Sequence, residues 1–457
     1  MRTAQFVTFG AIGALLALLA ACGGGGSKPS STPAESVAPS ATGGPKAEAL
    51  LIVADPDATK AVLAQALTLG SVKKYFLTSR SMDPASFDGL TFTDATVWGT
   101  VPTAPFAQDD DFNAAYESAY GHPASDVFGT AAAYDSVYVI ALAALAANSA
   151  DNAAIRDAIP FVANAPGEIT TYGEGAFSTA ADALVGGGNV SYIGASGQVD
   201  LDANGEIAKS SVQTWRLINN TIAPIETRDI DLAAEAGVVL PEGTPPSPGA
   251  TPERALSIGI IVSDDHSGTA LSDAARLAVD EIDAVGGVWG QDITFYVETI
   301  GGAAQASHAA NRLITDFGVQ AIIGPTSADA VQEVLPPAAE ANVPLLSLST
   351  DPALTAVDDP KNVLFRMVAS DALQMPVLAN LFLEGYPTPT PTAGIAPGEG
   401  PLPGSVCVLY QAGAAYEQMV ATYATAMTHK KATIRASVSF DPASGDYESL
   451  LKGCIGS

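Results

Sequence analysis

The sequence predicts an α/β fold of two lobes, each a mainly parallel sheet flanked by helices. Apolar runs of strand length alternate with helical patterns along most of the chain, which is typical of parallel strands joined by crossing helices. The alternation stops at residues 232–255, where Pro, Gly and Thr accumulate, and then restarts. With 457 residues the chain is long enough for two or three domains. We therefore expect a linker at 232–255 between two α/β halves.

The half after the linker shows this alternation most clearly. The strands expected there are 256–262, 293–298, 319–323, 343–348, 364–368, 406–410 and 433–440. The helices expected there are 271–285, 304–317, one that begins near residue 328, 416–428 and 447–452. A Pro- and Thr-rich insertion at 386–404 interrupts this order.

The half before the linker has the same character with weaker patterns. Its expected strands are 50–54, 74–78, 191–193 and 212–218. Its expected helices are 57–69, 112–120 and 128–147, the last with a long Ala/Leu face.

Charge excludes one class of function. Acidic residues outnumber basic ones by 49 to 20, which gives a formal charge of -29. Nucleic-acid binding needs Lys/Arg patches, and the sequence contains none. The acidic residues are spread thinly along the chain, so we interpret them as a solubilising surface and not as a metal site.

The N-terminus resembles a bacterial lipoprotein signal. A single Arg2 precedes an apolar stretch at 6–19, and the segment ends in Leu-Ala-Ala-Cys at residue 22. Cleavage would leave Cys22 as the lipid-carrying residue, and the Gly/Ser/Pro/Thr-rich residues 23–46 would form a disordered tether. The alternative is an uncleaved anchor, although the apolar run is shorter than the ~20 residues of a spanning helix. The signal predicts a folded part outside the cytoplasmic membrane, held there by lipid.

Two cysteines remain after Cys22. In an oxidising compartment Cys407 and Cys454 could form a disulfide, and the alternative is two buried thiols. Neither their spacing nor their neighbours indicate zinc, and the sequence predicts no cofactor.

Residues 324–355 carry the strongest functional signal. Two expected strands end there in turns rich in hydroxyl groups, first at Thr326 and Ser327 and then at Ser349 and Thr350. In open α/β sheets the carboxyl edge of the strands is where ligands bind. Backbone N–H groups at a helix start could hold a carboxylate. N-capping by Ser and Thr is the alternative explanation for one such turn, but two converging turns favour a ligand site.

Several segments resemble periplasmic binding proteins of the branched-chain amino-acid type. Residues 256–451 resemble the first half of that family through IGIIVS (258–263), DAARLAVDEIDAVGG (273–287), VQAIIGPTS (319–327), VPLLSLSTDPALT (343–355), LFRMVASDALQ (364–374) and VSFDPASGDYESLL (438–451). Residues 49–224 resemble the second half through LIVADPDATKAVLAQALTLG (51–70), FNAAYESAYG (112–121), TAAAYDSVYVIALAAL (130–145), VSYIGASGQVDLDANGE (190–206) and VQTWRLINN (212–220). The two halves stand in reverse order.

The reverse order has two explanations, a circular permutation of one two-lobed fold or a fragment of a tandem array. We favour permutation because residues 47–231 begin where residues 256–457 leave off, with little missing or duplicated. Domain termini often lie close together, so a 24-residue linker could join them. One lobe would then combine about 256–369 with 104–193. The other would combine about 373–457 with 47–97 and 212–218, and the crossings near 369–370, 99–100 and 194–197 would act as hinges.

The resemblance implies a ligand site between the lobes. In the family a hydroxyl residue four positions after the glycine binds the ligand carboxylate; Ala328 stands there, beside Ser327. Ser349 and Thr350 match the family's second contact pair.

On the other lobe the chain departs from the family. Arg80 stands where the family has a carboxylate for the ligand ammonium, and such a cation would favour an extra anionic group on the ligand. The alternative is a surface Arg80 with Asp83 in the acidic role. Asp55, in the turn Asp55-Pro56-Asp57, aligns with an aromatic contact of the family.

The resemblance implies an extracytoplasmic solute-binding lipoprotein that captures an amino acid or related carboxylate for an ABC permease. A regulatory or sensory lipoprotein acting through protein partners is the alternative. Residues 200–207 imitate the start of a calcium loop, but the twelfth position is Ser211, so we predict no metal there. No catalytic motif is present, and the four histidines are scattered in the sequence, so we expect no enzyme.

Overall fold

The computed structural model describes residues 46–456 except for 83, 103–109, 125–126, 165, 232–239, 242–250 and 386–404. The predicted signal at 1–22 with Cys22, the tether to residue 45, the insertion and most of the linker lie outside the described residues. Asp83 does as well. The predictions for these parts therefore stay predictions.

A five-stranded parallel sheet forms the core of one lobe, here called lobe A, in the order β10-β9-β11-β12-β13. Its strands are β9 (Ser257–Ser263), β10 (Thr294–Ile300), β11 (Ala321–Ile323), β12 (Leu345–Ser347) and β13 (Leu364–Arg366). Its main helices are α2 (Asp110–Tyr120), α3 (Thr130–Ala147), α4 (Asn152–Ala163), α5 (Glu174–Val185), α7 (His266–Ala284), α8 (Ala306–Asn311) and α9 (Ala328–Ala341). Short turns of helix are η4 (Ala303–Gln305), η5 (Arg312–Asp316) and η6 (Pro352–Ala356).

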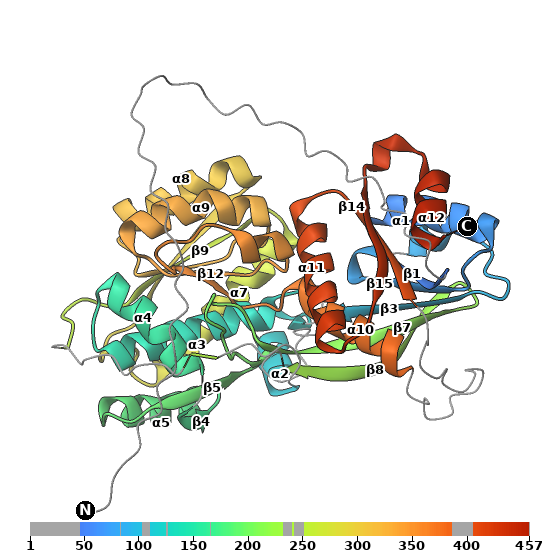
Figure 1. Ribbon diagram of the computed structural model, residues 1–457. Coiled ribbons are helices and arrows are strands. Elements are labelled where there is room, and N and C mark those ends of the chain that lie inside the picture. Colours follow the sequence, from blue (N-terminus) through green and yellow to red (C-terminus); the bar gives the residue numbers. More distant parts are fainter. Residues whose placement is uncertain are drawn as a thin grey trace, which may run out of the picture. The chain divides into compact units, whose positions relative to one another are not determined.

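Both faces of this sheet are covered, as a parallel sheet requires. Side chains alternate along a strand, so Ile260 belongs to the apolar cluster that includes α3 and α7, whereas Ile261 belongs to the cluster that includes α8 and α9. Figure 1 shows α8 and α9 on one side of β9 and β12, and α7 and α3 on the other. A small sheet of β4 (Glu168–Thr170), β5 (Val190–Gly194) and β6 (Gly197–Gln198) completes the lobe.

Lobe B is built on a seven-stranded sheet in the order β15-β14-β1-β2-β3-β7-β8. Its strands are β1 (Ala47–Val53), β2 (Lys74–Leu77), β3 (Thr96–Pro102), β7 (Lys209–Ile218), β8 (Thr221–Asp231), β14 (Ser405–Gln411) and β15 (Ile434–Phe440). Its helices are α1 (Pro56–Leu69), α10 (Gln374–Glu384), α11 (Ala414–His429) and α12 (Tyr447–Ile455), with the short η1 (Ser79–Ser81), η2 (Pro84–Phe87), η7 (Asp371–Leu373) and η8 (Pro442–Ser444). The first five strands are parallel, and β7 and β8 are antiparallel to their neighbours.

The two ends of the folded chain share this second sheet. β1 pairs with β14 in parallel, and Leu51 lies opposite Val408. Cys407 and Cys454 form a disulfide that ties β14 to α12, with their Cα atoms 5.6 Å apart. Of the two alternatives in the sequence analysis, a disulfide or two buried thiols, the disulfide is confirmed. The same sheet thus unites residues from before and after the linker.

The sequence analysis missed several elements. It left out the strands β3, β4, β6 and β8 and the helices α4, α5 and α10. It placed the last strand before the linker at 212–218, whereas β7 begins at Lys209 and pairs with β8. Pro224 breaks the alternation of β8, and it lies opposite Trp215, where the register shifts. Among the described helices, α3 is apolar and long enough to cross a membrane, but 94% of it is buried inside the fold.

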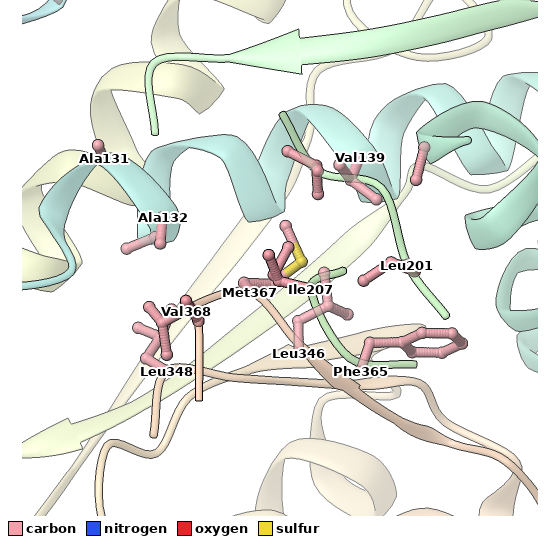
Figure 2. Packing of buried hydrophobic residues seen from close by; sticks show 14 of the residues in the cluster. Ala131, Ala132, Val139, Leu201, Ile207, Leu346, Leu348, Phe365, Met367 and Val368 are labelled. Carbon is pink, nitrogen blue, oxygen red and sulfur yellow. The ribbon is translucent and has the colours of Figure 1, made fainter. Parts of the chain in front are cut away.

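The chain leaves lobe A for lobe B near Ser370, where its core is tightly packed. Figure 2 shows Met367 and Val368, just before this crossing, among the side chains that α3 and the segment at 201–207 present to β12 and β13. Met367 and Val368 are buried, as is Leu346 on β12. This packing fixes the strand ends from which the site residues project.

Candidate ligand-binding site

Two turns leave the same edge of the lobe A sheet. Ile323 at the end of β11 lies opposite Leu346 near the end of β12, so the segments that follow both strands emerge side by side. After β11 the chain passes Thr326 and Ser327 and enters α9. After β12 it passes Ser349 and Thr350 and enters η6. The structure therefore brings together the two hydroxyl-bearing turns that the sequence singled out.

Part of this chemistry is N-capping. The Ser327 hydroxyl accepts from the Ala330 N–H at 3.3 Å, and the Ser349 hydroxyl accepts from the Asp351 N–H at 3.3 Å. Asp351 in turn accepts from the Ala353 N–H at 2.9 Å. The capping explanation thus holds for Ser327, and Ala328 contributes its backbone N–H at the start of α9.

The opposite wall comes from lobe B. β2 ends at Leu77, and the following turn η1 carries Ser79 and Arg80. The Ser79 N–H donates to Gln374 Oε1 at 2.8 Å, and Gln374 Nε2 donates back to the Ser79 hydroxyl at 2.7 Å. The Thr100 hydroxyl also donates to Gln374 Oε1, at 3.0 Å. A single buried amide therefore ties η1 to β3 and to the start of α10.

A cavity of about 470 Å³ lies between these walls. It is lined by Ser79, Arg80, Thr326, Ser327, Ala328, Asp329, Ser349, Thr350, Asp351 and Asp371. Six of the seven residues proposed from the sequence for ligand binding are in this set. The seventh, Asp55, is not.

Arg80 lies close to two carboxylates of the cavity, Asp351 of lobe A and Asp371 at the start of η7. Its Nη2 lies 3.4 Å from Asp351 Oδ2, and its Nε lies 4.0 Å from Asp371 Oδ2. The guanidinium also stands over the ring of Tyr416, 5.1 Å from its centroid. Burial opposes its charge, but Asp371 and then Asp351 outweigh burial and raise the pKa of Arg80 above its ordinary value. Arg80 is thus a permanently charged group held between acids.

Asp371 is the most perturbed carboxyl of the cavity. Burial raises its pKa from the ordinary 3.8 to about 6, while Arg80 acts in the opposite direction. Its hydrogen bonds are long, from the Ser79 hydroxyl at 3.4 Å and from the Thr350 hydroxyl at 3.5 Å. A largely buried carboxyl group with a raised pKa is typical of functional sites.

Asp55 lies behind Arg80. Its backbone N–H donates to Gln411 Oε1 at 3.2 Å, and its carboxylate accepts from Gln411 Nε2 at 3.1 Å. Burial and a hydrogen bond with Asp55 raise the pKa of Tyr416. Asp55 therefore supports the Arg80 surroundings from within lobe B.

Sequence reasoning missed four lining residues, namely Ser79, Asp329, Asp351 and Asp371. Asp329 and Asp351 follow hydroxyl residues in turns and resemble ordinary cap residues, so their charges drew no notice. Asp371 belongs to a segment quoted only for its family resemblance. An acidic residue within two positions of Ser327 and of Ser349 was the available signal for Asp329 and Asp351.

The calcium-like segment has a different role in the structure. Asp202 Oδ1 accepts the N–H groups of Asn204 and Glu206 at 2.8 and 3.0 Å, which closes a turn. Glu206 pairs with the buried guanidinium of Arg366 at 3.0 Å. The guanidinium of Arg366 is thus the cation that Glu206 contacts. The described residues contain no group of three or more side chains that could hold a metal ion.

The histidines are less scattered in space than in sequence. The rings of His122 and His266 lie 5.5 Å apart, far along the chain from each other. Both belong to lobe A, away from the residues that line the cavity. Their separation in the sequence gave no sign of this contact.

Residues 262–453 match the protein family described as periplasmic binding protein. The match confirms the resemblance for the half after the linker, which supplies β9 to β15 and the two turns of the cavity. No curated protein matches the chain.

Solved structures of periplasmic binding proteins are similar over part of their length. LivJ of Streptococcus pneumoniae, a branched-chain amino acid transporter substrate-binding protein solved with isoleucine, is 25% identical, covering 45% of this chain and 55% of that one, with a TM-score of 0.31. The leucine-binding protein LivK of Thermotoga maritima is 16% identical, with coverages of 43% and 52% and a TM-score of 0.28. A solute-binding protein of Rhodopseudomonas palustris solved with benzoate is 13% identical, with coverages of 43% and 51% and a TM-score of 0.30. The chain spans about half the length of these structures.

Proposed function

We propose that this protein is an extracytoplasmic solute-binding lipoprotein that captures an amino acid or related carboxylate and delivers it to an ABC permease. The observation that supports it most is the cavity of about 470 Å³, lined by two hydroxyl-bearing turns of lobe A and by η1 of lobe B. A cleft walled by two lobes can close around a ligand by hinge motion. The absence of an enzyme activity is part of the same proposal.

The start of α9 is the natural place for the ligand carboxylate. The first N–H groups of a helix have no partner within the helix, and the helix dipole favours an anion there. The Ser327 hydroxyl accepts from the Ala330 N–H, so the backbone N–H groups of Ala328 and Asp329 remain as donors for a ligand. The hydroxyls of Thr326 and Thr350 line the same cavity and can add hydrogen bonds.

The hinges of this proposal are the chain near residue 370 and the segment between β6 of lobe A and β7 of lobe B. The crossing expected at 99–100 lies instead inside β3 of lobe B, where Thr100 is paired with Thr214. At residues 194–197 the buried Asp135 of α3 accepts the N–H groups of Ala195 and Ser196 at 2.9 and 2.7 Å. It also accepts from the Tyr192 hydroxyl at 2.8 Å. A Cβ on Gly194 would lie 2.2 Å from the Asp135 carboxyl carbon, so only glycine fits there. Because Asp135 holds the chain at residues 194–196, we expect the hinge motion to be confined to the few residues between the lobes.

Location and anchoring rest on the cysteines. The disulfide between Cys407 and Cys454 suits an oxidising compartment, and Cys22 would carry the lipid. The order of the two halves is part of the proposal as well: we infer a circular permutation, and the pairing of β1 with β14 supports it.

Thermal unfolding with a panel of compounds tests this function. A ligand present at 100 times its Kd should stabilise the protein by about 2.7 kcal/mol, which is about 3 °C for a fold of this size. The panel should contain the standard L-amino acids, benzoate and small dicarboxylates. A panel without any shift would contradict solute binding and favour the regulatory lipoprotein with protein partners.

A matched pair of variants locates the binding. Thr350→Val removes a hydroxyl from the cavity and should raise the Kd of the bound compound about tenfold, because a hydrogen bond to a charged group contributes about 1.5–3 kcal/mol. Thr68→Val makes the same change on the exposed end of α1, where the hydroxyl donates to the Ala64 carbonyl. It should leave the Kd unchanged. Equal effects of the two variants would place the binding elsewhere.

A further inference from the structure

The cavity carries more acid than its guanidinium balances. Among the lining residues that the structure describes, Arg80 is positive, whereas Asp329, Asp351 and Asp371 are carboxylates. One positive against three negative charges gives a formal net charge of -2. The remaining lining side chains are hydroxyls and one alanine, so none of them offsets this charge.

Arg80 itself already has partners. Its guanidinium lies between Asp351 and Asp371, at 3.4 and 4.0 Å, and these carboxylates follow β12 and β13. Behind it stand Tyr416 and Asp55, both on lobe B. The sequence suggested that Arg80 selects a ligand with an extra anionic group. In the structure, an anionic group would have to compete with two carboxylates for this cation.

A cationic group meets the opposite situation. It can pair with Asp351 and Asp371 in place of Arg80, whose guanidinium keeps Asp55 and the Tyr416 ring as partners on its own lobe. Asp329 has no ion-pair partner among the described residues and lies in the first turn of α9. The formal charge of -29 on the whole chain also attracts cations toward the protein.

We propose that the cavity takes an amino acid of net positive charge. Its carboxylate lies at the start of α9, and its amine or guanidinium pairs with Asp351 and Asp371, displacing Arg80. Arg80 is then an internal competitor of the ligand cation and not the partner of a ligand anion. This inference rests on the proposed function, because it names the ligand class of the same cavity.

Two pairs of amino acids test the charge with matched shapes. L-Arginine and L-citrulline differ little in shape but differ in side-chain charge, as do L-lysine and L-norleucine. Isothermal titration of the full chain at neutral pH should show the charged member of at least one pair binding at least about tenfold more tightly. L-Glutamate and benzoate serve as anionic probes and should bind more weakly than that charged member.

The variant Arg80→Gln separates the two roles of the arginine. Loss of an internal competitor should strengthen binding of the cationic amino acid by about threefold or more, since an ion pair between partly exposed groups is worth about 1 kcal/mol. If Arg80 binds an anionic group of the ligand, the same variant must weaken binding.

Asp351→Asn removes a charge with little change of structure. Asparagine caps a helix about as well as aspartate, so the bond from the Ala353 N–H to the side chain can persist. We expect the cationic amino acid to bind about tenfold more weakly while its neutral counterpart is unaffected. Asp441→Asn is the matched control, because Asp441 also precedes a proline and caps a short helix through the Ala443 N–H, outside the cavity.

The outcomes are distinct for the two proposals. Tighter binding of the charged member, strengthened by Arg80→Gln and weakened by Asp351→Asn alone, supports the inference. Binding of citrulline, norleucine, glutamate or benzoate as tightly as arginine and lysine overturns it and leaves the solute-binding function standing. A lack of binding by every amino acid and carboxylate overturns both.

Discussion

Asp371→Asn should stabilise the unliganded protein at neutral pH, although it removes a carboxylate from the cavity. Burial raises the pKa of Asp371 from 3.8 to about 6 despite the nearby Arg80, so the folded protein pays to keep this group ionised. Its hydrogen bonds from the Ser79 and Thr350 hydroxyls are 3.4 and 3.5 Å long. Both hydroxyls can rotate and accept from an asparagine amide instead.

The size of the effect follows from the pKa. A rise from 3.8 to about 6 corresponds to a penalty of about 3 kcal/mol for the ionised form in the folded state, at 1.36 kcal/mol per pH unit. This value is an upper bound, because an asparagine amide reproduces the contacts of a protonated carboxyl group only in part. We expect Asp371→Asn to increase the free energy of unfolding by about 1–3 kcal/mol at pH 7.5.

The pH dependence gives this prediction its sign. Between pH 3.8 and about 6 the folded state binds more protons at Asp371 than the unfolded state, so the wild-type protein loses stability as the pH rises through that window. The asparagine does not titrate. The advantage of the variant should therefore be full above pH 6 and should vanish as the pH falls toward 3.8.

Urea unfolding of both proteins at pH 7.5, 6.0 and 4.5 measures the difference. A variant that is less stable at pH 7.5, or a difference that is equal at all three pH values, would refute the reasoning. Asp135→Asn is the control, since burial also raises the pKa of Asp135 to about 6. There the Ser196 N–H cannot turn away from an amide, and this unpaired donor costs about 1–3 kcal/mol and offsets the gain.

Three further changes test the frame around the cavity. Replacing Cys407 and Cys454 by serine should lower the free energy of unfolding by about 4 kcal/mol in urea, because the disulfide spans a sequence separation of 47 residues. A urea midpoint of the wild-type protein that is the same under reducing and oxidising conditions would contradict this. Gly99→Ala should cost about 1–3 kcal/mol by calorimetry, since its Cβ would lie 2.1 Å from the Trp215 ring; wild-type stability would mean that the indole moves freely. Gln374→Met removes the amide that holds η1, so it should weaken ligand binding in titration and lower the melting temperature. An unchanged Kd would mean that η1 takes no part in ligand binding.

The strands and helices were predictable where apolar residues keep one period. β9 and α7 have such patterns, and both formed where the sequence placed them within a few residues. β8 was not predictable in this way, because Pro224 interrupts its alternation and a shift of register opposite Trp215 accommodates it. α4 carries Pro160 inside the helix and was missed for a similar reason.

The hydroxyl turns of the site were predictable because strand ends and helix starts are local features. The acidic partners of Arg80 were not. Asp351 and Asp371 stand 271 and 291 positions after Arg80, and no local pattern shows which strand ends face each other across two lobes. The pKa of Asp371 depends on that closure and could not be inferred from its neighbours in sequence.

The sheet of lobe B shows why both ends of the folded chain are needed for the site. β14 lies between β15 and β1, and β1 lies between β14 and β2, whose end leads into η1 and Arg80. Residues 405–440 therefore form one side of the sheet that positions Arg80, while residues 326–351 supply the facing wall from the same half of the sequence. A chain in the usual family order would join these strands through α12 directly to β1. The permutation that we propose changes only which segments the chain joins directly. The parallel pairing of β14 with β1 keeps these two strands adjacent in the sheet.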